Sequence, residues 1–238
     1  MSVAALAVVA VLYAFGVRQA RRWPAWRSAA FGCGLVVAGV ALTGAGSGLS
    51  AHMAEHVLLT LVSAPLLILG APHTLAARVL GRAAARHLRR LALLAWPPLA
   101  WIAFGAVTLL VHLTGLFEYA LDHDWAHALE HLALFATALA FWTPVLAAPP
   151  APRTLGPVAR LAYLMSAMAP MGAVGAVLVN AGDPVYARYS VEQQADAGAA
   201  MWVGGGFALV FATVIAAWVA LEQEERRQRA RERYEDAR

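Results

Sequence analysis

The sequence predicts an all-α polytopic membrane protein, built as a seven-helix transmembrane bundle. Three observations support this prediction: 61% of the 238 residues are hydrophobic, only 13% are charged, and the apolar residues gather in long stretches. Soluble domains contain about 45–50% apolar and about 25% charged residues. The chain therefore has too much apolar surface for a water-soluble domain, and the lipid bilayer is its expected surrounding.

The apolar stretches define the expected spans, since a helix needs roughly 20 residues to cross the hydrocarbon core of a bilayer. The first stretch is the shortest, about 24 Å long as a helix. A secretory signal peptide carries its positive charges before its apolar stretch. Here the arginines follow it, so we interpret it as a short first span. The seven expected spans are residues 2–17, 28–49, 52–71, 91–115, 125–148, 157–181 and 199–221.

The spans leave no room for a separate soluble domain. Residues 1–221 are expected to form one transmembrane domain, followed by a charged cytoplasmic tail at residues 222–238. The tail reads EQEERRQRARERYEDAR and mixes acidic with basic residues over several helical turns. This pattern is typical of a solvated helix.

The arginines predict the orientation, because Lys and Arg accumulate in short cytoplasmic loops. The chain has no Lys, and its arginines follow the first, third, fifth and seventh spans, with Arg188 alone on the other face. We therefore expect the N-terminus outside and the C-terminus in the cytoplasm, and no nucleic-acid partner. The arginines on the expected cytoplasmic side are Arg18, Arg21, Arg22, Arg27, Arg78, Arg82, Arg86, Arg89, Arg90, Arg153, Arg160 and six from Arg226 to Arg238.

One motif occurs twice: AHMAEHVLL at Ala51–Leu59 returns as AHALEHLAL at Ala126–Leu134. Residues three and four positions apart share one helical face, and the third and fifth spans run in the same direction. Both faces are thus expected at the same depth near the outer surface, where ionisable residues normally face the bundle interior and mark a functional site. The two faces are His52, Glu55 and His56, and His127, Glu130 and His131.

Four imidazoles and two carboxylates that converge make a ligand set for a transition metal. We expect His52, His56, His127 and His131 to bind the ion, with Glu55 and Glu130 holding these histidines in place. Thioether sulfur favours Cu(I), whereas imidazole alone also suits zinc, so copper as Cu(I) is expected and zinc is the alternative. The single cysteine, Cys33, excludes a Cys-pair site. Additional candidate ligands at this depth are His112, His123, Met53, Met171 and Met201.

Acidic residues precede the fifth and seventh spans and would attract cations to the outer face. The plainer interpretations also remain open: the acids are solvated, and the histidines bond across helices or to lipid headgroups. The acidic residues are Glu118, Asp122, Asp124, Asp183, Glu192 and Asp196.

These motifs together resemble the polytopic CtaG family of cytochrome c oxidase assembly factors, from about residue 45 to 220. The first His pair runs into APLLILGAP (Ala64–Pro72), the second precedes FWTPVL (Phe141–Leu146), and a Gln-rich loop enters Met201 and Trp202. The family loop typically reads DQQ. Here the chain has Glu192, Gln193 and Gln194, followed by Asp196.

The resemblance implies a multi-pass protein of the bacterial plasma membrane that helps a haem-copper oxidase to mature. It implies copper handling on the outer side, through His52, His56, His127 and His131, with the oxidase subunits as partners. Such a role is not enzymatic. The sequence leaves open whether the chain forms a homo-oligomer.

Two other functions have to be weighed for the repeated motif, a metalloenzyme and an electron carrier with a bis-histidine haem. HxxEH is also the zinc signature of one class of metalloproteases, in which two histidines bind zinc and the glutamate activates water. An integral-membrane metalloenzyme, with zinc or two metal ions, is therefore the alternative. A haem held between two histidines needs a wide gap between facing helices, and imidazoles on successive turns of both helices would crowd that gap.

Overall fold

The described part of the chain is helical and contains no strand. The computed structural model describes residues 3–44, 46–79, 81, 95–146 and 154–236. Within these residues, five helical units are long and apolar enough to cross a membrane, and a sixth is bent by 67°. The five are α2 (Ala25–Thr43), the α3–η1–α4 unit (Leu49–Leu69), α8 (Asp124–Leu146), the α9–α10 unit (Pro157–Asn180) and α11 (Val191–Asp236), and the bent unit joins α6 (Pro97–Leu113) to α7 (Leu116–Asp122).

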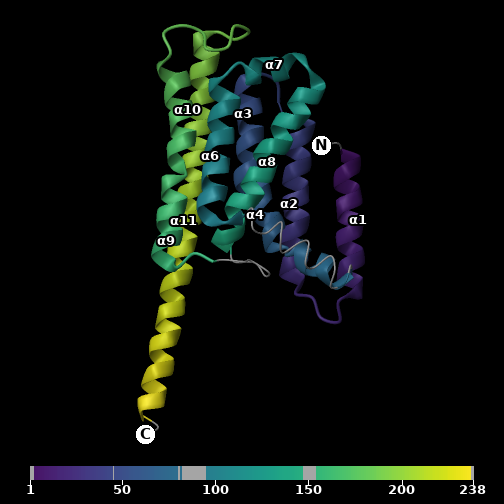
Figure 1. Ribbon diagram of the computed structural model, residues 1–238, viewed down its shortest axis with the longest axis vertical. Coiled ribbons are helices and arrows are strands. Elements are labelled where there is room, and N and C mark those ends of the chain that lie inside the picture. Colours follow the sequence, from purple (N-terminus) through teal and green to yellow (C-terminus); the bar gives the residue numbers. More distant parts are fainter. Residues whose placement is uncertain (1–2, 45, 80, 82–94, 147–153, 237–238) are drawn as a thin grey trace.

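The chain is therefore a polytopic all-α membrane protein, as the composition predicts. The remaining apolar helix, α1 (Val3–Gln19), has 17 residues and is shorter than a full span. In Figure 1, α1 lies at one flank beside α2, and α10 and α11 lie at the other flank. Between them run α3, α6 and α8, while the short α7 crosses one end of the bundle.

The expected third span changes its helix type in the middle. It consists of α3 (Leu49–Val57), a π-helical segment η1 (Leu58–Ser63) and α4 (Ala64–Leu69). In a π-helix the Thr60 carbonyl would accept from residue 65, which is Pro65 and has no N–H. Instead, the indole N–H of Trp142 donates to the Thr60 carbonyl at 2.9 Å. Trp142 of the FWTPVL motif thus links α8 to the third span by a hydrogen bond.

Small residues let the helices approach closely, as is common inside membranes. A Cβ atom on Gly175 of α10 would lie 2.8 Å from the carbonyl oxygen of Gly198 on α11, and one on Gly198 would lie 3.0 Å from that of Gly175. On the other side, the Ser63 hydroxyl donates to the Gly34 carbonyl of α2 at 2.9 Å. Larger side chains at these positions would push the helices apart.

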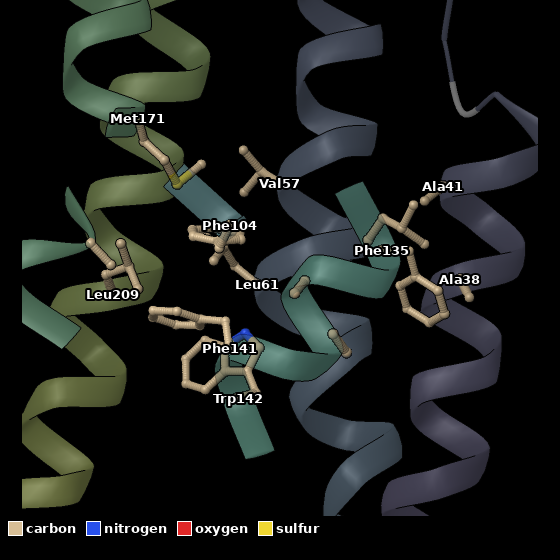
Figure 2. Close-up of a cluster of buried hydrophobic side chains, with 14 of the residues drawn as sticks. Ala38, Ala41, Val57, Leu61, Phe104, Phe135, Phe141, Trp142, Met171 and Leu209 are labelled. Carbon is tan, nitrogen blue, oxygen red and sulfur yellow. The ribbon is translucent and has the colours of Figure 1, made fainter. Parts of the chain in front are cut away.

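An apolar cluster fills the middle of the bundle. Figure 2 shows Phe104, Phe141, Trp142 and Leu209 gathered between the helices, with Met171 above them. The ring of Phe141 stacks on Phe104, with ring centroids 4.7 Å apart. Because such interiors are closely packed, the cluster gives rigid support to the polar residues of α3, α6 and α8 that lie nearer the end of the bundle crossed by α7.

The C-terminal tail continues α11 without a break to Asp236 and leaves the bundle as a single helix (Figure 1). Its arginines pair with glutamates on successive turns, including Arg226 with Glu222 and Arg229 with Glu225. The expected boundary between residues 221 and 222 therefore stays a prediction. Some residues used for the predicted topology lie outside the described ones: Arg82, Arg86, Arg89, Arg90, Arg153, Arg238 and the span ends 91–94 and 147–148.

Candidate metal centre

The two copies of the repeated motif meet across α3 and α8. The rings of His52 and His127 lie 5.1 Å apart between centroids, and those of His56 and His131 lie 5.0 Å apart. The diagonal pair, His52 and His131, is separated by 5.5 Å. Four imidazoles from two helices thus form one cluster, as the spacing in the sequence predicts.

One glutamate lies inside the cluster and the other at its edge. Both glutamates are buried, but Oε1 of Glu130 lies 3.2 Å from Nε2 of His56 and 3.7 Å from Nε2 of His52. Glu55 reaches only His52, with Oε2 at 3.8 Å from Nδ1. We expected both glutamates to support the histidines from behind. Glu130 is also close enough to the imidazole nitrogens to be a candidate ligand itself, and the supporting role of the two glutamates stays a prediction.

A hydrogen-bond chain from α6 orients His56. Nδ1 of His112 lies 2.8 Å from the Thr108 carbonyl and donates to it, since a carbonyl can only accept. A neutral imidazole has a single N–H, so Nε2 of His112 accepts from Nδ1 of His56 at 3.0 Å. Nε2 of His56 is then left with a lone pair that faces the Glu130 carboxylate. Two acceptors at this distance repel each other, and a cation between them removes the repulsion.

Unpartnered polar atoms mark the whole cluster. Nε2 of all four motif histidines and both carboxylate oxygens of Glu130 are buried without a hydrogen-bond partner. Each such atom costs about 1–3 kcal/mol when it stays unpaired, and native proteins leave few of them. A cation bound in the cluster would give all six of these atoms a partner. The donor set of imidazoles and a carboxylate fits a transition metal. The histidines are His52, His56, His127 and His131.

The candidate ligand atoms fall into two overlapping sets, within each of which they lie no more than 4.8 Å apart. One set is His52, His56 and His131, and the other is His52, His127 and Glu130. His52 belongs to both. Since metal–nitrogen bonds are about 2.0–2.1 Å long, small side-chain shifts would complete either set around an ion. This buried His–Glu group could hold a metal ion.

The other candidate ligands lie in different surroundings. His112 supports His56 through the hydrogen bond described above. His123 is exposed, donates through Nδ1 to the Tyr119 carbonyl at 2.9 Å, and belongs to neither ligand set. The three methionines are buried in the hydrophobic core, and the thioether of Met171 packs against Gly205. These three are Met53, Met171 and Met201.

A loop between α10 and α11 packs against residues beside the cluster, and the sequence alone did not reveal this contact. The Tyr186 hydroxyl donates to the His112 carbonyl at 2.7 Å, and its backbone N–H donates to Oε1 of Gln194 at 2.9 Å. Burial raises the pKa of Tyr186, which keeps its hydroxyl protonated as a donor. Its ring packs on Phe117, which in turn lies against His52. One signal was the presence of two tyrosines, Tyr186 and Tyr189, in the short segment GDPVYARYS.

Two of the acidic residues that the sequence predicts at the outer rim hold this loop. The Glu118 carboxylate accepts from the backbone N–H of Ala187, and Asp122 pairs with Arg188. The other four are exposed: Asp124, Asp183, Glu192 and Asp196. The rim therefore combines a structural role with a negative surface.

A side opening reaches the cluster from the direction of α6, α7 and α8. A cavity of about 290 Å³ lies between these helices and is lined by apolar side chains, with Glu130 as its one charged residue. Leu110, Leu116 and Leu129 on its rim are exposed on the surface of the chain. Glu130 thus contacts both the histidines and a cavity that opens towards the apolar outside of the bundle.

Fold and site together define a polytopic membrane protein with a buried His–Glu cluster suited to a metal ion. Residues 11–223 match the family model Caa3_CtaG, the cytochrome c oxidase caa3 assembly factor, and the chain belongs to this family. The resemblance inferred from the motifs is thereby confirmed.

Curated relatives occur in mycobacteria. The chain is 32% identical over 208 residues to uncharacterized proteins of Mycobacterium bovis and Mycobacterium tuberculosis, which covers 78% of this chain and 32% of each relative. It is 29% identical over 184 residues to an uncharacterized protein of Mycobacterium leprae, covering 68% of this chain and 28% of that protein. The chain therefore spans about a third of the length of these relatives. No solved structure matches it.

Proposed function

We propose that this protein binds copper as Cu(I) at the His–Glu cluster and delivers it to subunits of a haem-copper cytochrome c oxidase during assembly, without enzymatic activity. The bacterial plasma membrane is the proposed location. The observation that carries this proposal is the set of six buried, unpartnered ligand atoms on His52, His56, His127, His131 and Glu130. The family describes assembly factors for the caa3 oxidase, and an oxidase that contains copper needs a source of that metal.

The proposed topology has seven spans, with α1 as the first and the N-terminus outside. It is supported by the arginines of the α1–α2 loop and of the C-terminal tail. In Figure 1 the tail leaves the bundle at the end opposite to α7, and α7 directly precedes the second motif on α8. The metal cluster then lies near the outer face, where copper arrives.

The two ligand sets suggest the order in which the ion is bound. His127 begins the second motif nearer the outer end of α8 and is only half-buried, whereas His56 and His131 are buried one turn deeper. An ion would first meet His127, Glu130 and His52, and then move to His56 and His131 while His52 remains bound. The Glu130 carboxylate neutralises the charge of Cu(I), which lowers the cost of holding it at membrane depth.

Metal analysis of the protein, purified in mild detergent under reducing conditions, tests the proposal. We expect copper in the wild type, little copper in His56→Ala, and wild-type copper in the matched control His123→Ala, since His123 lies in neither ligand set. Equal copper in all three proteins at equal yield would refute the assigned site. Protein without copper after loading with Cu(I) would refute the function.

A membrane metalloenzyme is the second candidate. The set His52, His127 and Glu130 has two imidazoles and one carboxylate, which is the ligand set of several catalytic zinc sites. Zinc bound in preference to copper, together with hydrolytic activity that disappears in Glu130→Gln, would favour this function over copper delivery.

A further inference from the structure

The first half of the chain carries arginines for which it offers almost no acidic partner. Nine of the 18 arginines occur between residues 18 and 90, whereas residues 1–54 and 56–117 contain no Asp or Glu. The tail of α11 is the opposite case, because its arginines pair with glutamates of the same helix. The early arginines therefore have few acidic residues near them in the sequence, and an anion from another molecule could supply their counter-charge.

Two of these arginines share one tryptophan. The indole N–H of Trp23 donates to the hydroxyl of Tyr13 at 3.1 Å, and this hydroxyl donates to the Gly70 carbonyl at 2.9 Å, which fixes the indole at the end of α4. The guanidinium carbons of Arg27 and Arg78 lie 5.4 Å and 5.9 Å from the centre of its ring. Among the described residues no carboxylate pairs with either arginine, so their mutual repulsion is not relieved.

Polar atoms beside these cations also lack partners. Nε of Arg27 and Nε2 of His73 are buried and make no hydrogen bond with the described residues. His73 lies in the helical stretch 72–79 that follows the third span. Burial, together with the charge of Arg27, lowers the pKa of His73 to about 4, so its imidazole is neutral at pH 7 and can still donate an N–H. We call Trp23, Arg27, His73 and Arg78 the arginine–tryptophan cluster.

We propose that the arginine–tryptophan cluster binds the phosphate group of an anionic phospholipid in the surrounding leaflet. Guanidinium groups match phosphate oxygens with paired hydrogen bonds, and a phosphate would supply the missing negative charge. Tryptophans lie at the level of lipid headgroups, and clustered basic residues there attract anionic lipids. A lipid fits better than a soluble phosphate, because Leu12 and Phe15 on the adjoining α1 expose apolar side chains to the acyl chains.

Native mass spectrometry of the full chain in mild detergent, titrated with phosphatidylglycerol and separately with phosphatidylcholine, tests this proposal. We expect retained phosphatidylglycerol at lipid concentrations where phosphatidylcholine is lost. Arg27→Gln should weaken phosphatidylglycerol binding more than about fivefold, which is the contribution of any one arginine near an anionic surface. The matched control is Arg22→Gln, which removes an exposed arginine of the same loop and should weaken binding by no more than this general contribution.

Three outcomes would overturn the proposal. Equal retention of the two lipids would remove the phosphate charge as the cause. An equal loss in Arg22→Gln and Arg27→Gln would indicate attraction by the whole basic loop rather than a site. Displacement of the lipid by millimolar inorganic phosphate would assign the site to a soluble anion. If Arg27→Gln does not fold, judged by its thermal melting, the exposed Arg78→Gln takes its place. Copper content is measured in parallel and should not change.

Discussion

The two copies of the AHxxEH motif have the same histidines and glutamate but different surroundings. On α8, Glu130 points among the histidines, with Oε1 at 3.2 Å from Nε2 of His56. On α3, the equivalent Glu55 lies at the edge, 3.8 Å from His52. Conversely, Nδ1 of His56 is hydrogen-bonded to Nε2 of His112 on α6, while Nε2 is without a hydrogen-bond partner in both His56 and His131. The repeat in the sequence is therefore not a symmetric site.

The neighbouring helix accounts for this difference. The hydrogen-bonded chain from α6 reaches the α3 copy, because His112 and Thr108 lie beside His56. Glu55 instead faces the turn after α2, where a Cβ atom on Gly44 would lie 3.6 Å from its carboxylate. A motif specifies which side chains share a helical face, and the helix packed against that face decides what each one does.

The largest expected effect is the loss of a buried histidine. His56→Ala and His131→Ala should each weaken copper binding more than about 100-fold, beyond the 10–100-fold typical of residues that only support a ligand. The double variant should be hardly weaker than either single one, since ligands of one ion do not act independently. Competition with a Cu(I) chelator measures the affinities at matched protein yield. Additive losses would mean two separate sites.

The two glutamates provide the sharpest comparison of the motif copies. Glu130→Gln should weaken copper binding about 10–100-fold, because it removes a negative charge beside His52 and His56. Glu55→Gln should cost less than about threefold, below the range for residues that support a ligand. The same chelator competition applies to both variants, and each serves as the control of the other. Equal losses would show that the two copies are equivalent after all.

His112 should matter only through His56. His112→Ala removes the acceptor that keeps the lone pair of His56 directed at Glu130, and we expect about 10-fold weaker copper binding. X-ray absorption of the copper-loaded protein should show the number of imidazole ligands unchanged, since His112 orients a ligand without being one. The control is His123→Ala at the exposed start of α8. If the spectrum of copper-loaded His112→Ala showed one imidazole ligand fewer than the wild type, His112 would itself be a ligand.

The smallest expected effect concerns the loop between α10 and α11 that contains Tyr186. Tyr186→Phe removes one buried hydrogen bond to the His112 carbonyl and should lower the free energy of unfolding by about 1 kcal/mol. Copper affinity should change little, while the chelator should remove copper faster, because the loop opens more often. Thermal melting and stopped-flow chelation measure the two effects. The control is Tyr189→Phe, because Tyr189 lies in the same loop. Unchanged removal kinetics would show that the loop does not cover the site.

The sequence by itself determined the class of the protein and the membership of the cluster. Apolar stretches of membrane length predict helices whatever their neighbours, because a backbone in lipid has to satisfy its hydrogen bonds within the helix. The spacing of His52 and His56, and of His127 and His131, places each pair on one face because the helical period is fixed. These local rules were sufficient to predict a polytopic helical protein and four converging histidines.

Only the tertiary structure decided the roles within the cluster. The hydrogen bonds of Trp142 to Thr60, of His56 to His112 and of Tyr186 to the His112 carbonyl join residues far apart in the chain. The spacing of residues in the sequence does not reveal such contacts. The sequence alone therefore could not distinguish the surroundings of Glu55 from those of Glu130. The physical reason is that a helix determines which way its own side chains point, while the charge and hydrogen bonds that each one meets come from other helices.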